Sequence, residues 1–327
     1  MLMSESEKRT DSNETGLSDS NQSTNRKSSD EFKIRVGDFV EVRSTRYIEQ
    51  TLDSDGCLDG LPFMPEMLEM CGRKFRVKTI ANKTCVAGQY VGTLNDVYVL
   101  QTDKRCDGSA HGDCQMACNF FWKRSWLEQL DGSGNGTAEE NVDTLKEFLV
   151  EHSTKNASCF RCQATELITI APSSSAFKPN QYIKDIRSGI PAFAVVKFLF
   201  GLLAKKLLRR SDNLVGPCTG RTPLVKLDLK VGDKVRVKSL EGIRETLDPN
   251  GCNRGLWFDP AEMATFCDRE MVVSRVVHRL IDEETGELKI LKVPSVVLSE
   301  TECSGLFRRF CSRGMLHFWR EVWLERV

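Results

Sequence analysis

The sequence lacks an excess of charge of either sign. Among its 327 residues, 46 are Lys or Arg and 46 are Asp or Glu, which leaves a net charge near zero at pH 7. Proteins dedicated to nucleic acid usually carry a basic excess or a basic stripe on one face. The charge balance therefore argues against a nucleic acid as the partner.

The sequence also lacks an apolar run long enough to cross a membrane. Its most apolar stretch, residues 190–204, is interrupted by Lys197, whereas a spanning helix needs about 20 apolar residues. Residues 1–31 are polar and rich in serine, without the apolar core of a signal peptide. They predict a disordered tail and a cytoplasmic protein.

Cysteine, in contrast, is abundant. The chain holds 13 cysteines, an odd number. In a reducing compartment, we expect these residues to be metal ligands or small buried side chains rather than disulfides.

Two stretches of the chain repeat the same motifs. V-G-D-F-V-E-V-R-S begins at Val36 and V-G-D-K-V-R-V-K-S begins at Val231, and the pattern C-x7-C-x7-W-x3-W-L starts at both Cys106 and Cys303. The repeated unit of roughly 90 residues is far longer than a solenoid repeat, which predicts an internal duplication. Residues kept in both copies are expected to serve the fold, and residues found in one copy are candidates for function.

The patterns within each copy predict mainly short strands. Alternating apolar and polar residues, separated by turn-forming stretches, are typical of a small barrel, and V-G-D-x-V-x-V resembles the first strand of SH3-like barrels. We therefore predict an α+β protein with two SH3-like barrels joined by a helical insert. The expected parts are a disordered tail (1–31), a first repeat (32–130), a linker and helical insert (131–222) and a second repeat (223–327).

A cysteine cluster distinguishes the first copy. Cys85, Cys106, Cys114 and Cys118 occur there, with His111 between them. Structural zinc is held by four thiolate or imidazole ligands. The sequence predicts a zinc site formed by the four cysteines, with His111 as the substitute for one of them.

The second copy keeps two of these five residues and replaces three. The aligned pairs are Cys106 with Cys303, Cys114 with Cys311, Cys85 with Ile281, Cys118 with Met315 and His111 with Arg308. Four interpretations stay open: zinc in the first copy alone, buried core cysteines throughout, an iron–sulfur cluster, or a catalytic Cys–His pair that uses His111 as base. Cys159 and Cys162 form a Cys-x2-Cys pair that suits either redox chemistry or a contribution to a metal site.

Two further apolar features could serve either to bind a partner or to pack in the interior of the protein. Trp122 and Trp126, matched by Trp319 and Trp323, share one helical face and are expected to seal the cores rather than bind a ligand. Residues 193–210 contain Phe193 and end in a basic segment that includes Arg210. This segment predicts either a helix packed between the repeats or an interfacial helix on an anionic membrane.

Three longer motifs resemble a family of bacterial proteins to which no activity is assigned. They are R-C-D-G-S-A-H-G-D-C-Q from Arg105, C-Q-A-T-E-L from Cys162 and F-W-R-E-V-W-L-E-R-V from Phe318. The resemblance implies no function. The residues favour a non-enzymatic binding or scaffold protein, peripheral to the membrane if the helix is interfacial, with an unidentified protein partner. The alternatives are a metal- or thiol-dependent enzyme and a nucleic-acid-binding small-barrel protein.

Overall fold

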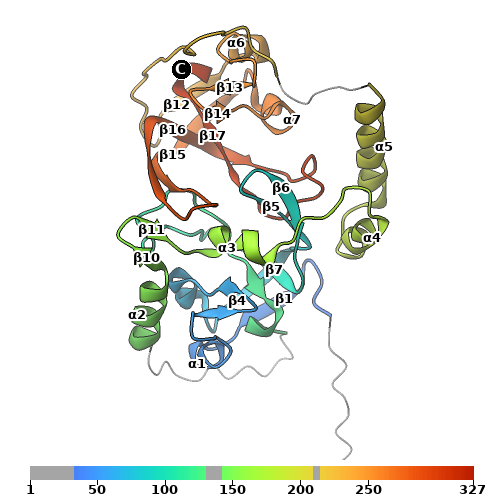
Figure 1. The fold of residues 1–327 in the computed structure, drawn as a ribbon, viewed down its shortest axis with the longest axis vertical. Helices are drawn as coiled ribbons and strands as arrows, with labels where there is room; N and C mark the ends of the chain where they lie inside the picture. The colour runs from blue at the N-terminus through green and yellow to red at the C-terminus, as the bar shows by residue number, and fades with distance from the viewer. Residues whose placement is uncertain (1–32, 130–141, 209–213) are drawn as a thin grey trace, which may run out of the picture. The chain divides into compact units, whose positions relative to one another are not determined.

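The computed structural model describes residues 33–129, 142–208 and 214–327. The expected tail (1–31) and the Gly-rich linker lie outside the described residues. The described chain is mixed α and β, as the sequence predicts, and it holds two five-stranded antiparallel sheets (Figure 1).

The first sheet has the strand order β8-β7-β4-β1-β9, with antiparallel neighbours throughout. Its strands are β1 (Phe39–Val42), β4 (Lys74–Ile80), β7 (Val97–Gln101), β8 (Trp122–Lys123) and β9 (Leu127–Gln129). The second sheet has the order β17-β16-β15-β12-β18. Its strands are β12 (Lys234–Val237), β15 (Glu270–Ile281), β16 (Leu288–Glu302), β17 (Leu316–Trp319) and β18 (Leu324–Arg326).

Neither sheet closes on itself, so the expectation of closed barrels is wrong. The edge strands β8 and β9 of the first sheet are two and three residues long and do not pair with each other. Closure requires the first and last strands of a sheet to hydrogen-bond along a shared register. Strands this short leave each sheet open at both edges.

We call the segment that carries the first sheet the first half and the segment that carries the second sheet the second half. Short elements connect the strands, and most occur at equivalent places in the two halves. In the first half they are α1 (Thr45–Glu49), β2 (Cys57–Leu58), β3 (Leu61–Pro62), η1 (Pro65–Met70), β5 (Lys83–Val86), β6 (Tyr90–Thr93) and η2 (Arg124–Trp126). In the second half they are α6 (Leu240–Arg244), β13 (Cys252–Asn253), β14 (Leu256–Trp257), α7 (Pro260–Met263), η3 (Ala264–Phe266) and η4 (Glu321–Trp323). Where the first half has the separate hairpin β5–β6, the second half prolongs β15 and β16.

The middle segment is mostly helical. It consists of α2 (Val142–His152), β10 (Thr154–Asn156), β11 (Cys159–Phe160), α3 (Gln163–Ile170), α4 (Pro179–Arg187) and α5 (Ala192–Leu208). Leu145 and Leu149 of α2 and Leu167 of α3 are buried in the core of the first sheet. The first half and these two helices thus share one core. This core places α3 beside the cysteine-rich loop, which is the segment 102–121 between β7 and β8.

Each core is sealed by a tryptophan with the same hydrogen bond. The indole Nε1 of Trp126 donates to Thr51 Oγ1, and that of Trp323 donates to Thr246 Oγ1, both at 3.0 Å. All four matched tryptophans are buried. The prediction that they seal the cores is confirmed.

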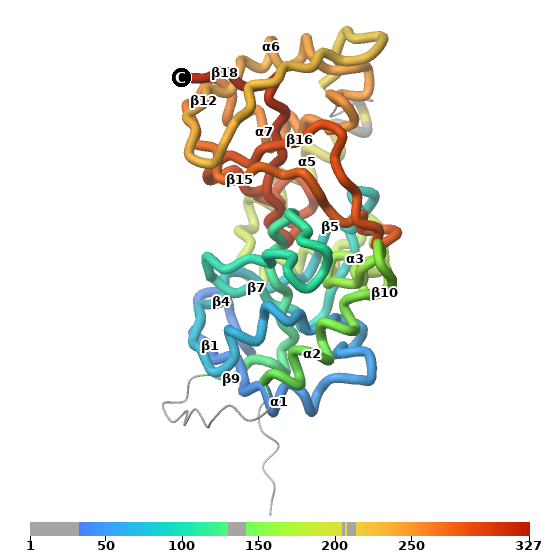
Figure 2. The backbone as a smooth tube through the Cα atoms, turned by 90° about the vertical axis from the view of Figure 1, so that its left-hand side faces the viewer, coloured from blue at the N-terminus to red at the C-terminus, as the bar shows by residue number. Residues whose placement is uncertain are grey.

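The two halves exchange contacts crosswise. The amide of Gln115 donates to the carbonyl of Arg279 at 3.1 Å, and the aligned amide of Ser312 donates to the carbonyl of Lys83 at 3.0 Å. The cysteine-rich loop of each half therefore pairs with a strand of the other half. The tube in Figure 2 follows these segments from a second direction.

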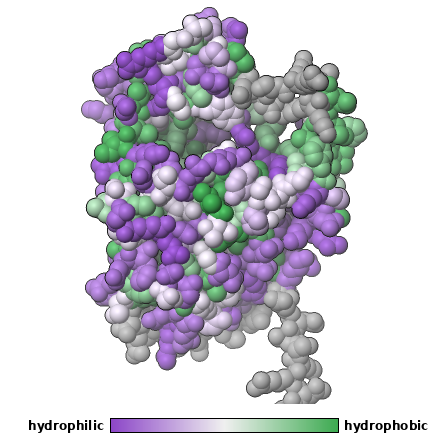
Figure 3. All heavy atoms as spheres, viewed as in Figure 1, coloured by the Kyte–Doolittle hydropathy of each residue, from purple (hydrophilic) through white to green (hydrophobic). Residues whose placement is uncertain are grey.

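Helix α5 is only partly covered. Phe198 packs against Tyr182 of α4 and against Phe310, with ring centroids 6.2 and 5.4 Å away. Phe193 and Phe200 are 74% and 70% exposed, and apolar surface is visible over α5 in Figure 3. No described helix is both long and apolar enough to traverse a bilayer.

Candidate metal centre

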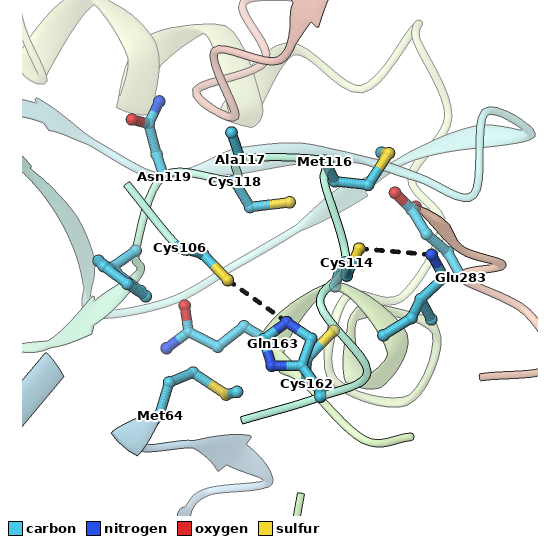
Figure 4. A pocket seen from close by; sticks show the side chains of 14 residues that line it. Met64, Cys106, Cys114, Met116, Ala117, Cys118, Asn119, Cys162, Gln163 and Glu283 are labelled. Carbon is cyan, nitrogen blue, oxygen red and sulfur yellow. Dashed lines mark hydrogen bonds between the residues drawn. The ribbon is translucent and has the colours of Figure 1, made fainter. Parts of the chain in front are cut away.

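The cysteine-rich loop between β7 and β8 and the start of α3 enclose a small cavity. Cys106, His111, Cys114 and Cys118 line it from the loop, and Cys162 lines it from the N-cap of α3 (Figure 4). The cavity measures about 30 Å³, which is room for one ion or one water-sized group. The structure thus brings together four of the five residues predicted for the zinc site.

Cys85 lies elsewhere. It belongs to β5, and its amide donates to Cys311 Sγ of the second half at 3.1 Å. The aligned residue Ile281 makes the reciprocal contact, because its amide donates to Cys114 Sγ at 3.4 Å. Cys85 is therefore part of the crosswise pairing and does not line the cavity.

Three buried side chains form the tightest group of donor atoms. Cys106 Sγ lies 3.3 Å from His111 Nε2 and 3.9 Å from Glu66 Oε1, and His111 Nδ1 lies 3.6 Å from the same carboxylate oxygen. The donor atoms of these three residues all lie within 4.8 Å of one another. Sulfur, imidazole and carboxylate are the protein ligands of transition metals, so this group has the chemistry of a metal site.

Two polar atoms at this place lack a protein partner. Among the described residues, His111 Nδ1 and Glu66 Oε2 are buried without a hydrogen bond. Buried polar atoms are almost always paired, and each exception requires an explanation such as an ion or a water molecule. Their position beside Cys106 fits a bound cation.

Burial determines whether the cysteine and histidine side chains of the site are protonated. It raises the pKa of Cys114 to about 11 and that of Cys162 to about 12, and it also raises the pKa of Cys106 and of Cys118. Burial lowers the pKa of His111 to about 4. At neutral pH the free side chains are therefore neutral thiols and a neutral imidazole. A thiol in this state is a weak nucleophile, because the thiolate is the reactive form.

One ion pair from the second half closes the cavity. Arg313 is buried and bonds both oxygens of Glu283 at 2.5 and 2.8 Å and the carbonyl of Cys85 at 3.0 Å. Glu283 lines the cavity. Its turn joins β15 to β16, so the second half contributes the outer wall.

The second half has no comparable donor set at the equivalent place. Cys303 Sγ lies 3.6 Å from Glu262 Oε1, which reproduces the Cys106–Glu66 contact. Arg308 stands at the position of His111 and forms an ion pair with Asp259 at 3.1 Å. A guanidinium has no lone pair to offer a metal.

Sequence reasoning missed Glu66. The signal was there, because Glu66 in P-E-M and Glu262 in P-A-E-M are matched in the two copies. Matched residues were expected to serve the fold, and this one contacts a cysteine in both halves. A search against protein-family models finds no match to the chain, and a search of curated proteins finds none either.

Proposed function

We propose that the chain is a non-enzymatic binding or scaffold protein whose first half is stabilised by a zinc ion in the cysteine-lined cavity. The observation that supports a structural role is the closed, neutral state of the site. Cys106, His111 and Cys114 are buried, and the pKa of each cysteine that lines the cavity is raised. Catalytic zinc keeps an open coordination position and catalytic cysteine needs a lowered pKa. The metal- or thiol-dependent enzyme has neither feature in its favour.

Zinc is the favoured ion for chemical reasons. Soft sulfur donors select zinc among the common divalent cations, and hard ions such as magnesium prefer oxygen. A structural zinc site also contributes directly to folding energy. The expectation of a zinc cofactor from the sequence is retained as part of this proposal.

We also infer that the two halves are SH3-like units related by duplication in a bacterial, cytoplasmic protein. The shared strand order supports this inference, as does the matched Trp–Thr hydrogen bond. Loops on a rigid scaffold are frequent sites of binding, which agrees with a protein partner. Nucleic acid remains disfavoured by the charge balance.

Metal analysis of protein purified without chelator tests the zinc proposal. We expect one zinc per chain and a melting temperature that falls when zinc is removed. Cys118→Ser should lose the zinc, and Cys218→Ser should keep it, because Cys218 lies away from the cavity and contacts the carbonyl of Glu245. Metal-free protein with an unchanged melting temperature would overturn the proposal.

A second candidate function, reversible binding to an anionic membrane, is favoured by the exposed face of α5. Phe193, Val196, Phe200 and Leu203 follow the spacing of one helix face, and all four are more than half exposed. Lys197 is exposed on the same helix. The four basic residues that follow in the sequence (Lys205, Lys206, Arg209 and Arg210) would each add roughly 1 kcal/mol of attraction to acidic lipid.

Co-sedimentation with vesicles of phosphatidylcholine and phosphatidylserine tests this second candidate. We expect binding at low salt that weakens with added salt, and that is lost in Phe193→Ser/Phe200→Ser and in Lys205→Glu/Arg209→Glu. Phe39→Ser is the matched control, since Phe39 is 59% exposed but lies on β1. Absence of binding at low salt, or equal loss in the control, would remove the membrane from this account.

A further inference from the structure

We propose that the zinc ligands are four sulfurs, those of Cys106, Cys114, Cys118 and Cys162. The inference rests on the proposed zinc site and assigns its ligands. It replaces Cys85 with Cys162, which comes from the helical insert. It also leaves His111 and Glu66 outside the coordination sphere.

The first argument is geometric. All four sulfur-bearing residues line the same cavity of about 30 Å³, and their sulfurs face a common space in Figure 4. Cys159, the other member of the Cys-x2-Cys pair, faces away and contacts the carbonyl of Thr285 at 3.2 Å. Among the described residues, only the donor atoms of Glu66, Cys106 and His111 lie within 4.8 Å of one another. Zinc with Zn–S bonds of about 2.3 Å would therefore have to draw the four sulfurs together by side-chain rotation.

The second argument concerns the donors that surround the sulfurs. Backbone N–H groups are directed at Cys106 from Gly108, at Cys114 from Met116 and Ile281, and at Cys162 from Ala164 and Thr165. Cys162 is the N-cap of α3, where the helix dipole favours negative charge. These N–H groups would stabilise the three sulfurs as thiolates once a cation is bound.

Cys118 completes the set through charged side chains. The guanidinium groups of Arg313 and Arg105 lie near its sulfur and favour its ionised form. Burial keeps the four sulfurs as neutral thiols while no cation is bound, and four buried thiolates would need a cation among them. A divalent cation at the centre, with Arg313 and Arg105 beside it, would displace the thiol protons and balance the charge of the thiolates.

The second half supplies an internal control. It keeps Cys303 and Cys311, but Met315 replaces Cys118, and the insert that carries Cys162 occurs once in the chain. Two of the four proposed ligands are therefore lost together. Full coordination by two remaining sulfurs is not feasible.

Glu66 and His111 have contacts of their own beside the four sulfurs, although Glu66 Oε2 and His111 Nδ1 have no hydrogen-bond partner among the described residues. The Glu–Cys contact recurs in the second half, where Glu262 also accepts the amide of Ser304 at 3.0 Å, so the glutamate supports the loop in both halves. His111 Nε2 lies within hydrogen-bond distance of Cys106 Sγ. As the N–H donor, it is a positioning residue for that thiolate.

Cobalt substitution and thiol mapping test the assignment. Co²⁺-loaded wild type should show the sulfur-to-metal charge-transfer absorption of four thiolates, and Cys162→Ser should lose about one quarter of it, as expected for one ligand in four, or lose the metal. Cys85→Ser should match the wild type. His111→Gln should keep the full absorption.

In wild-type protein, chelator should expose Cys106, Cys114, Cys118 and Cys162 to alkylation, as mapped by mass spectrometry. This experiment does not depend on the folding of any variant.

The outcomes separate this inference from the proposal on which it rests. The four-sulfur set is overturned if Cys162→Ser keeps the metal with unchanged absorption while Cys85→Ser or His111→Gln loses the metal. The zinc proposal would still stand after that result. The same conclusion would follow if chelator made Cys85, and not Cys162, accessible to alkylation. Wild-type protein that binds neither zinc nor cobalt overturns both.

Discussion

At the residue scale, His317 on β17 is a half-buried titratable group that the first half does without. The first half has Phe120 at the aligned position. Burial lowers the pKa of His317, and its Nε2 is one of the buried atoms without a hydrogen bond among the described residues. The ring packs against Phe266 with centroids 6.3 Å apart. A phenyl ring therefore suits this place better than an imidazole.

We expect His317→Phe to stabilise the protein, most of all in acid. Histidine in the unfolded chain binds a proton below about pH 6.5, whereas the folded chain keeps His317 neutral to a lower pH. The free energy of unfolding therefore falls as the pH drops from about 6.5 toward the folded pKa. Removing the unpaired nitrogen should also add about 1–3 kcal/mol. Urea unfolding at about pH 5 and about pH 7.5 measures both effects, and the reverse change Phe120→His should introduce the acid sensitivity into the first half. A wild-type pH profile retained by His317→Phe would contradict this account.

Predictability from the sequence differs among individual residues. The four tryptophans and the clustering of Cys106, His111, Cys114 and Cys118 followed from motif spacing within one loop. Cys85 and Cys162 did not, because their positions depend on strands and helices far along the chain. Glu66 was not found, since a carboxylate at the start of a short helical turn is ordinarily a helix-stabilising residue.

At the element scale, an ion pair fastens α4 to β5. Lys83 of β5 and Asp185 of α4 are 1% and 2% exposed and form a direct salt bridge. The ammonium also lies 4.5 Å from the ring centroid of Tyr182 and donates to the carbonyl of Arg309 at 3.2 Å. This pair joins the insert to the crosswise contact between the two halves.

Lys83→Met should destabilise the protein by about 3–5 kcal/mol, because it leaves the Asp185 carboxylate buried and unpaired. Lys83→Met/Asp185→Leu should recover most of the loss, since an apolar pair of similar volume replaces a buried ion pair at little cost. The added volume has room, because Asp185 borders a cavity of about 180 Å³. Urea unfolding of the three proteins decides the matter. A double variant as unstable as the single one would show that the charges are needed for more than each other.

The same scale explains which elements the sequence could predict. The alternating residues of V-G-D-F-V-E-V indicate β1, and the segment D-E-E-T-G-E is typical of a turn such as the one between β15 and β16. The sequence could not indicate that this turn packs on the cysteine-rich loop of the other half. Pairings such as Lys83 with Asp185, which are 102 residues apart, leave no local pattern.

At the scale of the whole molecule, the two halves stabilise each other through exchanged loops. Cys114 accepts the amide of Ile281, and Cys311 accepts the amide of Cys85. Because the halves differ in their cysteines, a metal ion in the first half is expected to affect them unequally. The exchanged contacts are made by β5 and by the end of β15.

Hydrogen exchange with and without chelator measures this inequality. Removal of zinc should release the amides of the loop 102–121 and of α3, because the binding energy of a structural metal is also folding energy. The effect should reach Ile281 through its bond to Cys114 and leave β12 and β18 protected. Met315→Leu, at the position aligned with Cys118, should leave the pattern unchanged. Equal loss of protection in both sheets would contradict an ion held in the first half, because only an ion shared by both sheets would loosen both on removal.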